Sequence, residues 1–153
     1  MRAWVVGGVA LAVGLVGAAS AADQAAIKPD EIIAARQAGF DLQQGVFAAM
    51  KAAVETGGPV KPLSDGAKGL VSWGHVIPSM FPEGTETGHE TKAKKEIWTD
   101  RAGFEKAAAN FTTQAEKLLT LAKADDKAGF AAQFKETGAA CDACHRGYRV
   151  KTE

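Results

Sequence analysis

The feature that most constrains this chain is a short motif near its C-terminus, Cys141-Asp142-Ala143-Cys144-His145, which contains the only two cysteines of the sequence. Cys-x-x-Cys-His is the attachment sequence of a covalently bound c-type haem. Residues three and four apart share one face of a helix, with about 5–6 Å between their Cβ atoms. Both thiols can then meet one porphyrin edge while the imidazole reaches the iron. The motif therefore predicts one haem c, attached through Cys141 and Cys144 and ligated at its iron by His145.

Three other uses of the two cysteines fit this sequence less well. A thioredoxin-like redox pair is expected near a βαβ pattern, at the start of a helix, whereas this motif ends a chain with helical periodicity. A disulfide within one helix would strain the backbone and close a loop too small to stabilise the fold much. A zinc site needs four ligands, and only His75 and His89 remain outside the motif to complete it.

The N-terminus has the pattern of a secretory signal peptide. Arg2 supplies a short basic region, residues 3–17 are apolar and uncharged, and Ala19-Ser20-Ala21 is a small-residue cleavage signal. The apolar run is shorter than the roughly 20 residues that a membrane-spanning helix needs. We therefore expect residues 1–21 to be removed, with cleavage after Ala21, and the mature protein to lie in the periplasm.

The charge balance of the chain gives no reason to expect a nucleic-acid partner or a membrane surface. Cleavage would remove one of the 18 basic residues, Arg2, and none of the 18 acidic residues. The mature chain is then nearly neutral, so it lacks the field that attracts polyanions. Its length of about 130 residues indicates one domain, residues 22–153.

The apolar periodicity of the mature chain is helical throughout. A first helix is expected from Pro29 to about Val54, because an apolar residue recurs at every seventh position from Ile33. A weaker second helix is expected over about 62–77, followed by a Pro- and Gly-rich loop at 78–89. The clearest pattern, in residues 90–123, predicts the third helix.

The fourth helix carries the haem motif on its apolar face. Asp125 and Asp126 form the turn before it, and either can cap its N-terminus. One stripe with helical spacing then runs through the segment and comprises Phe130, Phe134, Thr137, Cys141, Cys144 and Tyr148. The cysteines continue a core stripe, so the haem should lie inside the fold. Four amphipathic helices predict an all-α, antiparallel four-helix bundle.

Four segments, in this order and spacing, resemble the cytochrome c′ family over essentially the whole mature chain. They are Arg36-Gln37, the loop Phe81–Glu86, Glu96-Ile97-Trp98, and the segment Cys141–Arg149. The resemblance implies an exported four-helix bundle that carries one covalent haem c. It also implies a role in binding small gases or in carrying single electrons.

The resemblance assigns further residues to the haem site. Arg36 and Gln37 match a pair that meets the haem propionates, and a guanidinium near a core seam independently needs an anionic partner. Arg149 matches a basic residue beside the proximal imidazole. Lower-ranked matches are Thr85 and Glu86, at the haem edge, and Trp98, whose packing near the ring ordinary core packing would explain almost as well.

The position above the distal face of the iron is Phe40 in this chain. Five-coordinate members of the family have an apolar residue there, whereas low-spin cytochromes of the c-556 type have a methionine that becomes the sixth ligand. The resemblance therefore implies a five-coordinate, high-spin iron with an apolar distal pocket that binds nitric oxide or carbon monoxide. The c-556 type remains the alternative.

An enzyme such as a peroxidase or a nitric oxide reductase is the less favoured class. A peroxidase needs a distal acid–base pair, and Phe40 supplies neither group. The sequence does not identify a redox partner. Family resemblance allows a homodimer through the first two helices, for which the apolar pair Val46-Phe47 would be suitable.

Overall fold

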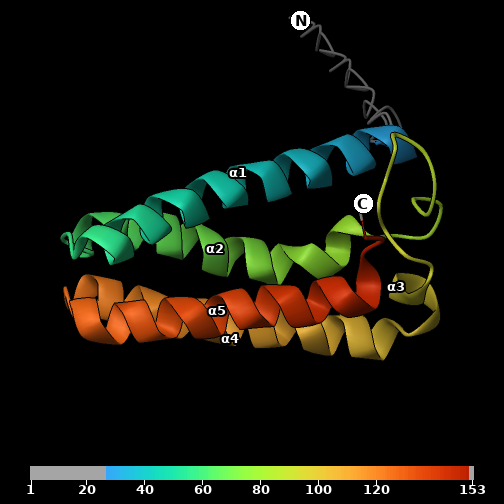
Figure 1. Cartoon of the computed structure of the whole chain (residues 1–153). Coiled ribbons are helices and arrows are strands. Elements are labelled where there is room, and N and C mark those ends of the chain that lie inside the picture. The colour runs from blue at the N-terminus through green and yellow to red at the C-terminus, as the bar shows by residue number, and fades with distance from the viewer. Residues whose placement is uncertain (1–26, 152–153) are drawn as a thin grey trace, which may run out of the picture.

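The computed structural model describes residues 27–151 and forms an all-α, four-helix bundle, as predicted. The expected signal peptide lies outside the described residues. The four long helices are α1 (Pro29–Thr56), α2 (Ser64–Val76), α4 (Arg101–Lys123) and α5 (Lys127–Tyr148). Successive long helices run in opposite directions (Figure 1). No helix within residues 27–151 is long and apolar enough to cross a membrane.

Helix α1 begins and ends where its sequence predicts. Pro29 occupies the first turn, and the Glu31 carboxylate accepts a hydrogen bond from the backbone N–H of Lys28 at 3.0 Å. This contact and the acidic first turn satisfy free N–H groups and favour the positive end of the helix dipole. The helix ends at Gly57, whose φ of 66° is a conformation that glycine adopts without strain.

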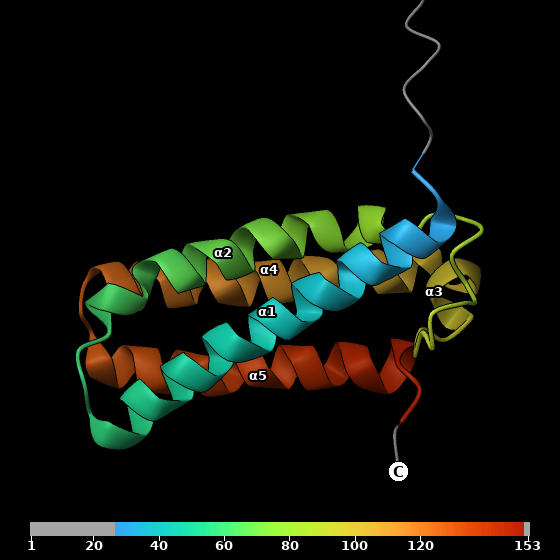
Figure 2. The same cartoon turned by 90° about the horizontal axis from the view of Figure 1, so that it is seen from above.

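The helices do not pack equally closely. Helices α2 and α5 lie along α4 and share most of the core with it, whereas α1 has a smaller contact with each of its neighbours. Viewed from above, α1 crosses diagonally over the other helices, from the end of α2 towards the beginning of α5 (Figure 2). This crossing leaves part of α1 facing the C-terminal half of α5 across a space that other side chains line.

The predicted third helix, residues 90–123, was wrong at its N-terminal end. Residues before Glu96 form a loop, in which His89 and Glu90 have positive φ values of 44° and 50°. A single turn, α3 (Glu96–Thr99), then ends at Asp100, which has a non-helical ψ of 55°. The Asp100 carboxylate accepts a hydrogen bond from Gly103 N–H at 3.2 Å and caps α4. An N-cap inside the apolar pattern thus divides the helix.

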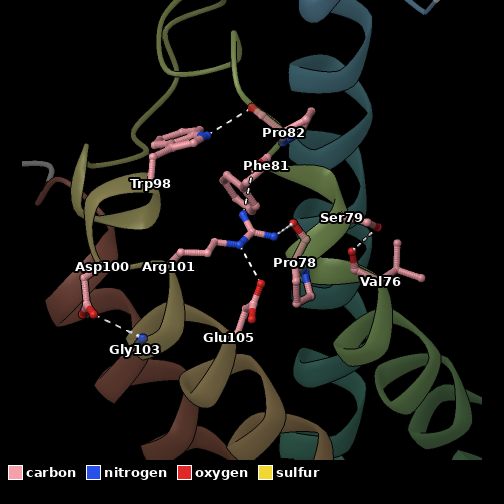
Figure 3. A network of polar contacts seen from close by, with 10 residues as sticks. All are labelled: Val76, Pro78, Ser79, Phe81, Pro82, Trp98, Asp100, Arg101, Gly103 and Glu105. Carbon is pink, nitrogen blue, oxygen red and sulfur yellow. Dashed lines mark hydrogen bonds and ion pairs between the residues drawn. The ribbon is translucent and has the colours of Figure 1, made fainter.

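The predicted second helix and its following loop also differ in detail. A 3₁₀ turn, η2 (Lys61–Leu63), precedes α2, and a second one, η3 (Ile77–Met80), occupies the start of the expected loop. Arg101 fixes η3 against α4, because its guanidinium donates to Pro78 O at 2.7 Å and to Phe81 O at 3.0 Å (Figure 3). The segment that follows α2 is therefore tied to the bundle.

Candidate functional site

A cavity of about 650 Å³ opens between α1 and the C-terminal half of α5, with α4 as its floor. Apolar side chains dominate the floor: Ile77, Phe81, Ile97, Phe104, Ala108 and Phe111. The size is that of a site for a cofactor or a drug-sized ligand. In residues 27–151, the haem-attachment motif of α5 faces α1 across this apolar cavity.

The motif forms the α5 wall of this cavity. Cys141, Cys144 and His145 all line it, and both cysteines are half-buried free thiols. Burial, with a smaller effect of the Asp142 charge, raises the pKa of Cys141 to about 11. Burial also raises the pKa of Cys144. These thiols are therefore protonated at neutral pH, unlike the thiolate of a redox-active pair.

The imidazole of His145 lies in a setting that favours its neutral form. Burial and the nearby charge of Arg149 lower the pKa of His145, and the charge of Asp142 opposes this shift. A neutral imidazole is the form that ligates metals. Among residues 27–151, no group of three or more His, Cys, Asp or Glu side chains is gathered around a possible metal-ion position.

The α1 wall presents Phe40 to the cavity. Its ring packs edge-on against Trp73 of α2, with ring centroids 5.3 Å apart, and lies 6.4 Å from the ring of Phe81. Gly39 allows this contact, because a Cβ there would lie 2.2 Å from the Trp73 ring. The bulky Phe40 thus packs against two aromatic neighbours, opposite the wall that carries His145.

Arg36 lies at the end of the same wall and is almost fully buried, with 2% of its surface exposed. Its guanidinium donates to Thr85 Oγ1, Thr85 O and Thr91 Oγ1 at 2.8 Å each, and to Met80 O at 3.3 Å. It also lies 4.4 Å above the Phe81 ring. Desolvation lowers the pKa of Arg36, and the charge of Glu86 partly offsets this. The protein partners of Arg36 are neutral oxygens, and the predicted contact with a haem propionate stays a prediction.

The remaining predicted residues fall into two groups. Gln37 and Arg149 line the cavity, and Gln37 donates to His89 O at 2.8 Å. Thr85, Glu86 and Trp98 do not line it. Thr85 binds Arg36, Glu86 accepts from Gly84 N–H at 3.1 Å, and Trp98 donates to Pro82 O at 3.1 Å (Figure 3). These three side chains shape the loop next to the cavity.

The C-terminal segment is pinned beside the cavity mouth. Ala93 and Arg149 form an isolated antiparallel bridge, in which Lys94 N–H donates to Tyr148 O at 3.0 Å. The Tyr148 hydroxyl donates to Asp100 at 2.7 Å, which raises the pKa of Tyr148 to about 12. The same Asp100 caps α4. The last turn of α5, which carries His145, is therefore held to both α4 and the loop before α3.

Sequence reasoning missed several residues of the cavity wall. Gln43, Glu90, Lys92 and Tyr148 all line it. Gln43 was detectable, because it lies three residues after Phe40 on the face that α1 turns inward. Glu90 and Lys92 were not, since the sequence predicted a helix for their segment and gave no signal of the left-handed loop that brings them there.

The cavity fits a haem c on the chemistry of its walls. A large flat apolar group would contact the floor, two protonated thiols and a neutral imidazole project from one helix, and cationic groups lie at the rim. Each of these features suits one part of such a cofactor: the ring, its side chains, the iron and the carboxylates. The lining of the cavity therefore supports the haem c that the motif predicts.

Comparison with known proteins decides the family. A model described as Cytochrome C′ matches residues 31–149. The chain belongs to the cytochrome c′ family. This family binds haem c, and Cys141 and Cys144 are the two cysteines that covalent attachment requires.

This chain matches individual relatives over most of their length. The cytochrome c′ of Rubrivivax gelatinosus is 35% identical over 127 residues, which cover 81% of this chain and 98% of that protein. A cytochrome c-556 of Agrobacterium tumefaciens (strain II Chrys) is 38% identical over 103 residues, which cover 67% of this chain and 71% of the relative.

Solved structures agree with the family assignment. The crystal structure of the Rubrivivax gelatinosus cytochrome c′ has a TM-score of 0.73 at 32% identity, over 80% of this chain and 97% of the other. A nitric oxide complex of a mutant cytochrome c prime from Alcaligenes xylosoxidans has a TM-score of 0.75 at 30% identity, over 84% of this chain and all of the other. The predicted cytochrome c′ fold is confirmed.

Proposed function

We propose that this chain is a periplasmic haem c protein with a five-coordinate, high-spin iron that reversibly binds nitric oxide and carbon monoxide. Cys141 and Cys144 would form the thioether bonds, and His145 would be the single protein ligand of the iron. The observation that carries the proposal is Phe40, which faces the cavity from the wall opposite His145. A phenyl ring offers no donor atom to iron, so Phe40 would not ligate it, and the bulk of the ring would leave room for a small diatomic ligand only.

Bound haem would supply the redox-active, gas-binding iron, and the side chains of the cavity would determine which ligands can reach it. Phe40 is held between Trp73 and Phe81, so it restricts the space on its side of the cavity. The bridge at Arg149 and the Tyr148–Asp100 hydrogen bond hold the turn that carries His145. Related proteins support this role, since solved relatives from Alcaligenes xylosoxidans include a nitric oxide complex and a carbon monoxide-bound variant.

Absorption and electron paramagnetic resonance spectra of the ferric, ferrous and nitric oxide-bound protein test the proposal. High-spin ferric spectra and a stable nitric oxide adduct are expected. A low-spin ferric spectrum at neutral pH would instead favour the c-556 type. The variant Phe40→Met should convert the protein to a low-spin form, whereas the control Phe47→Met should not, because Phe47 packs on Phe134 at 5.0 Å.

Single-electron transfer is the second candidate function, and a cluster of cations at the cavity mouth favours it. The bridge between Ala93 and Arg149 joins two basic segments. Residues 90–96 and 142–151 carry Lys92, Lys94, Lys95, Arg146, Arg149 and Lys151, against the acidic Glu90, Glu96 and Asp142. Such a rim would steer an acidic redox partner towards the edge of the cofactor.

Charge reversal tests this second role. The double variant Lys92→Glu/Lys151→Glu should slow oxidation of the ferrous protein by ferricyanide and reduce the salt dependence of the rate. The control Lys117→Glu/Lys123→Glu changes the net charge equally on exposed positions of α4, away from the bridge. Equal slowing by both double variants would mean that only net charge matters.

We further propose export, cleavage after Ala21, and the absence of enzyme turnover. The mass of the mature protein from the periplasmic fraction tests the first two. Efficient peroxide turnover without a stable gas adduct would overturn the third.

We also propose a homodimer, but with an interface that differs from the Val46-Phe47 pair expected from the sequence. Phe47 packs on Phe134 within the bundle, and Val46 lies close to Gly66 of α2, so this pair is partly occupied. Leu42 is 75% exposed on the outer side of α1 and is the apolar side chain most available to a partner. Sedimentation of the wild type and of Leu42→Glu tests this, because a dimer through α1 should dissociate in the variant.

A further inference from the structure

Helix α1 turns one continuous stripe of side chains towards the bundle. Its members repeat at alternating intervals of three and four residues: Ile33, Arg36, Phe40, Gln43, Phe47, Met50 and Val54. Two members of this stripe are polar. Arg36 makes four hydrogen bonds to the protein. Gln43 is the other, and its surroundings differ.

The carboxamide of Gln43 lies in the cavity wall without a protein partner for its oxygen. Gln43 lines the cavity, and its Oε1 is buried but accepts no hydrogen bond from the described residues. The next residue, Gln44, also lines the cavity, but it is exposed and donates to Asp41 at 3.5 Å. Buried polar atoms are almost always hydrogen-bonded in native proteins. An amide in this position therefore points to a polar group inside the cavity.

We propose that Gln43 Oε1 holds a water molecule in the haem cavity, beside Phe40, and that the second O–H of this water can donate to the outer atom of a diatomic gas. An amide oxygen accepts hydrogen bonds and water has two O–H donors, so one water molecule can bridge the amide and a bound ligand. Residues three apart are neighbours on a helix, which places Gln43 next to Phe40 on the wall opposite His145. The subsite rests on the proposed gas-binding function and adds a polar group to a wall that the sequence predicted to be apolar.

Trp73 offers the competing explanation for the same atom. Its Nε1 is also buried without a partner among the described residues, and its ring contacts Phe40 from α2. Trp73 does not line the cavity, whereas Gln43 does. A direct hydrogen bond from the indole to the amide would make Gln43 a packing residue. The two explanations differ in whether a ligand in the cavity senses the amide.

The test compares the carbon monoxide complexes of the ferrous holoprotein and its variants. Gln43→Leu removes the carboxamide at similar volume, and Gln43→Ala serves as a second variant with a smaller side chain. Gln133→Leu is the matched control, because Gln133 of α5 is half-buried like Gln43 but does not line the cavity. In both Gln43 variants the C–O stretching frequency should rise, and carbon monoxide should dissociate about two- to tenfold faster, as expected for loss of one hydrogen bond. Gln133→Leu should change neither quantity.

The other outcomes contradict either the Gln43 subsite alone or the proposed gas-binding function as well. Unchanged stretching frequency and dissociation rate in the Gln43 variants, with normal binding by the wild type, would overturn the subsite alone. If Gln43→Leu and Trp73→Phe then lowered the unfolding midpoint equally, the indole would be the partner of the amide. A wild-type protein that forms no carbon monoxide adduct would overturn the proposed gas-binding function, and the subsite with it.

Discussion

Replacing Arg36 by methionine tests what holds the segment between α2 and α3 in place. The guanidinium joins α1 to three residues of that segment, Met80, Thr85 and Thr91, through four hydrogen bonds. No carboxylate of the described residues forms an ion pair with it. Methionine fills a similar space without donors, so the variant removes these bonds while leaving little cavity.

The expected loss of stability follows from the acceptors left behind. The carbonyl oxygens of Thr85 and Met80 would lose a charged donor, and a buried unpaired acceptor costs about 1–3 kcal/mol. The Thr85 hydroxyl keeps a partner, because it also donates to Pro82 O at 2.8 Å. Removing a buried charge recovers part of the loss. We expect the free energy of unfolding to fall by about 2–4 kcal/mol.

Urea unfolding of the holoprotein, followed by far-ultraviolet circular dichroism, measures this loss. Arg36→Lys is the matched variant: it keeps the charge, but one ammonium group cannot reach all four acceptors, so an intermediate loss is expected. Amide hydrogen exchange should accelerate in residues 80–91, which depend on the guanidinium. A fall of less than about 1 kcal/mol for Arg36→Met would show that the segment is held by other contacts.

Two further predictions concern close packing and pH. Gly39→Ala should lower the free energy of unfolding by about 1–2 kcal/mol, because the clash with the Trp73 ring outweighs the better helix propensity; an increase would refute the close approach. The backbone N–H groups of Val60 and Lys61 lower the pKa of Asp125, so its stabilisation is present above the usual carboxyl pKa and is lost as pH falls through the lowered value. Asp125→Ala should therefore be less stable than wild type at pH 7, with a difference that shrinks in acid; a pH-independent difference would refute this role.

Local spacing in the sequence was sufficient for the elements whose cause is local. The seven-residue recurrence in α1 and the stripe through Phe130 and Cys141 follow from helix geometry alone, so both helices were predicted correctly. Asp126 was one of two possible caps, and the structure shows that it accepts from Gly129 N–H at 2.9 Å. The boundary of α4 was missed because apolar periodicity continues through Asp100, where a single cap divides the helix.

The candidate site depended on distant contacts for most of its wall. The stripe of α1 was visible in the sequence, but whether Gln43 Oε1 has a hydrogen-bond partner depends on how the other helices pack. The haem propionate expected beside Arg36 stays a prediction, but the hydrogen bonds of this side chain to Met80, Thr85 and Thr91 could not be foreseen, because they depend on how a distant loop folds against α1.

The sequence by itself determined the cofactor, because Cys141, Cys144 and His145 are adjacent in the chain and a helix alone places them together. It also determined the number of long helices, since each has its own apolar period. Only the tertiary structure decided which side chains line the cavity, how the C-terminal segment is held beside it, and where the basic side chains cluster. Those properties arise from segments more than fifty residues apart, such as Ala93 and Arg149, whose meeting depends on how the helices pack.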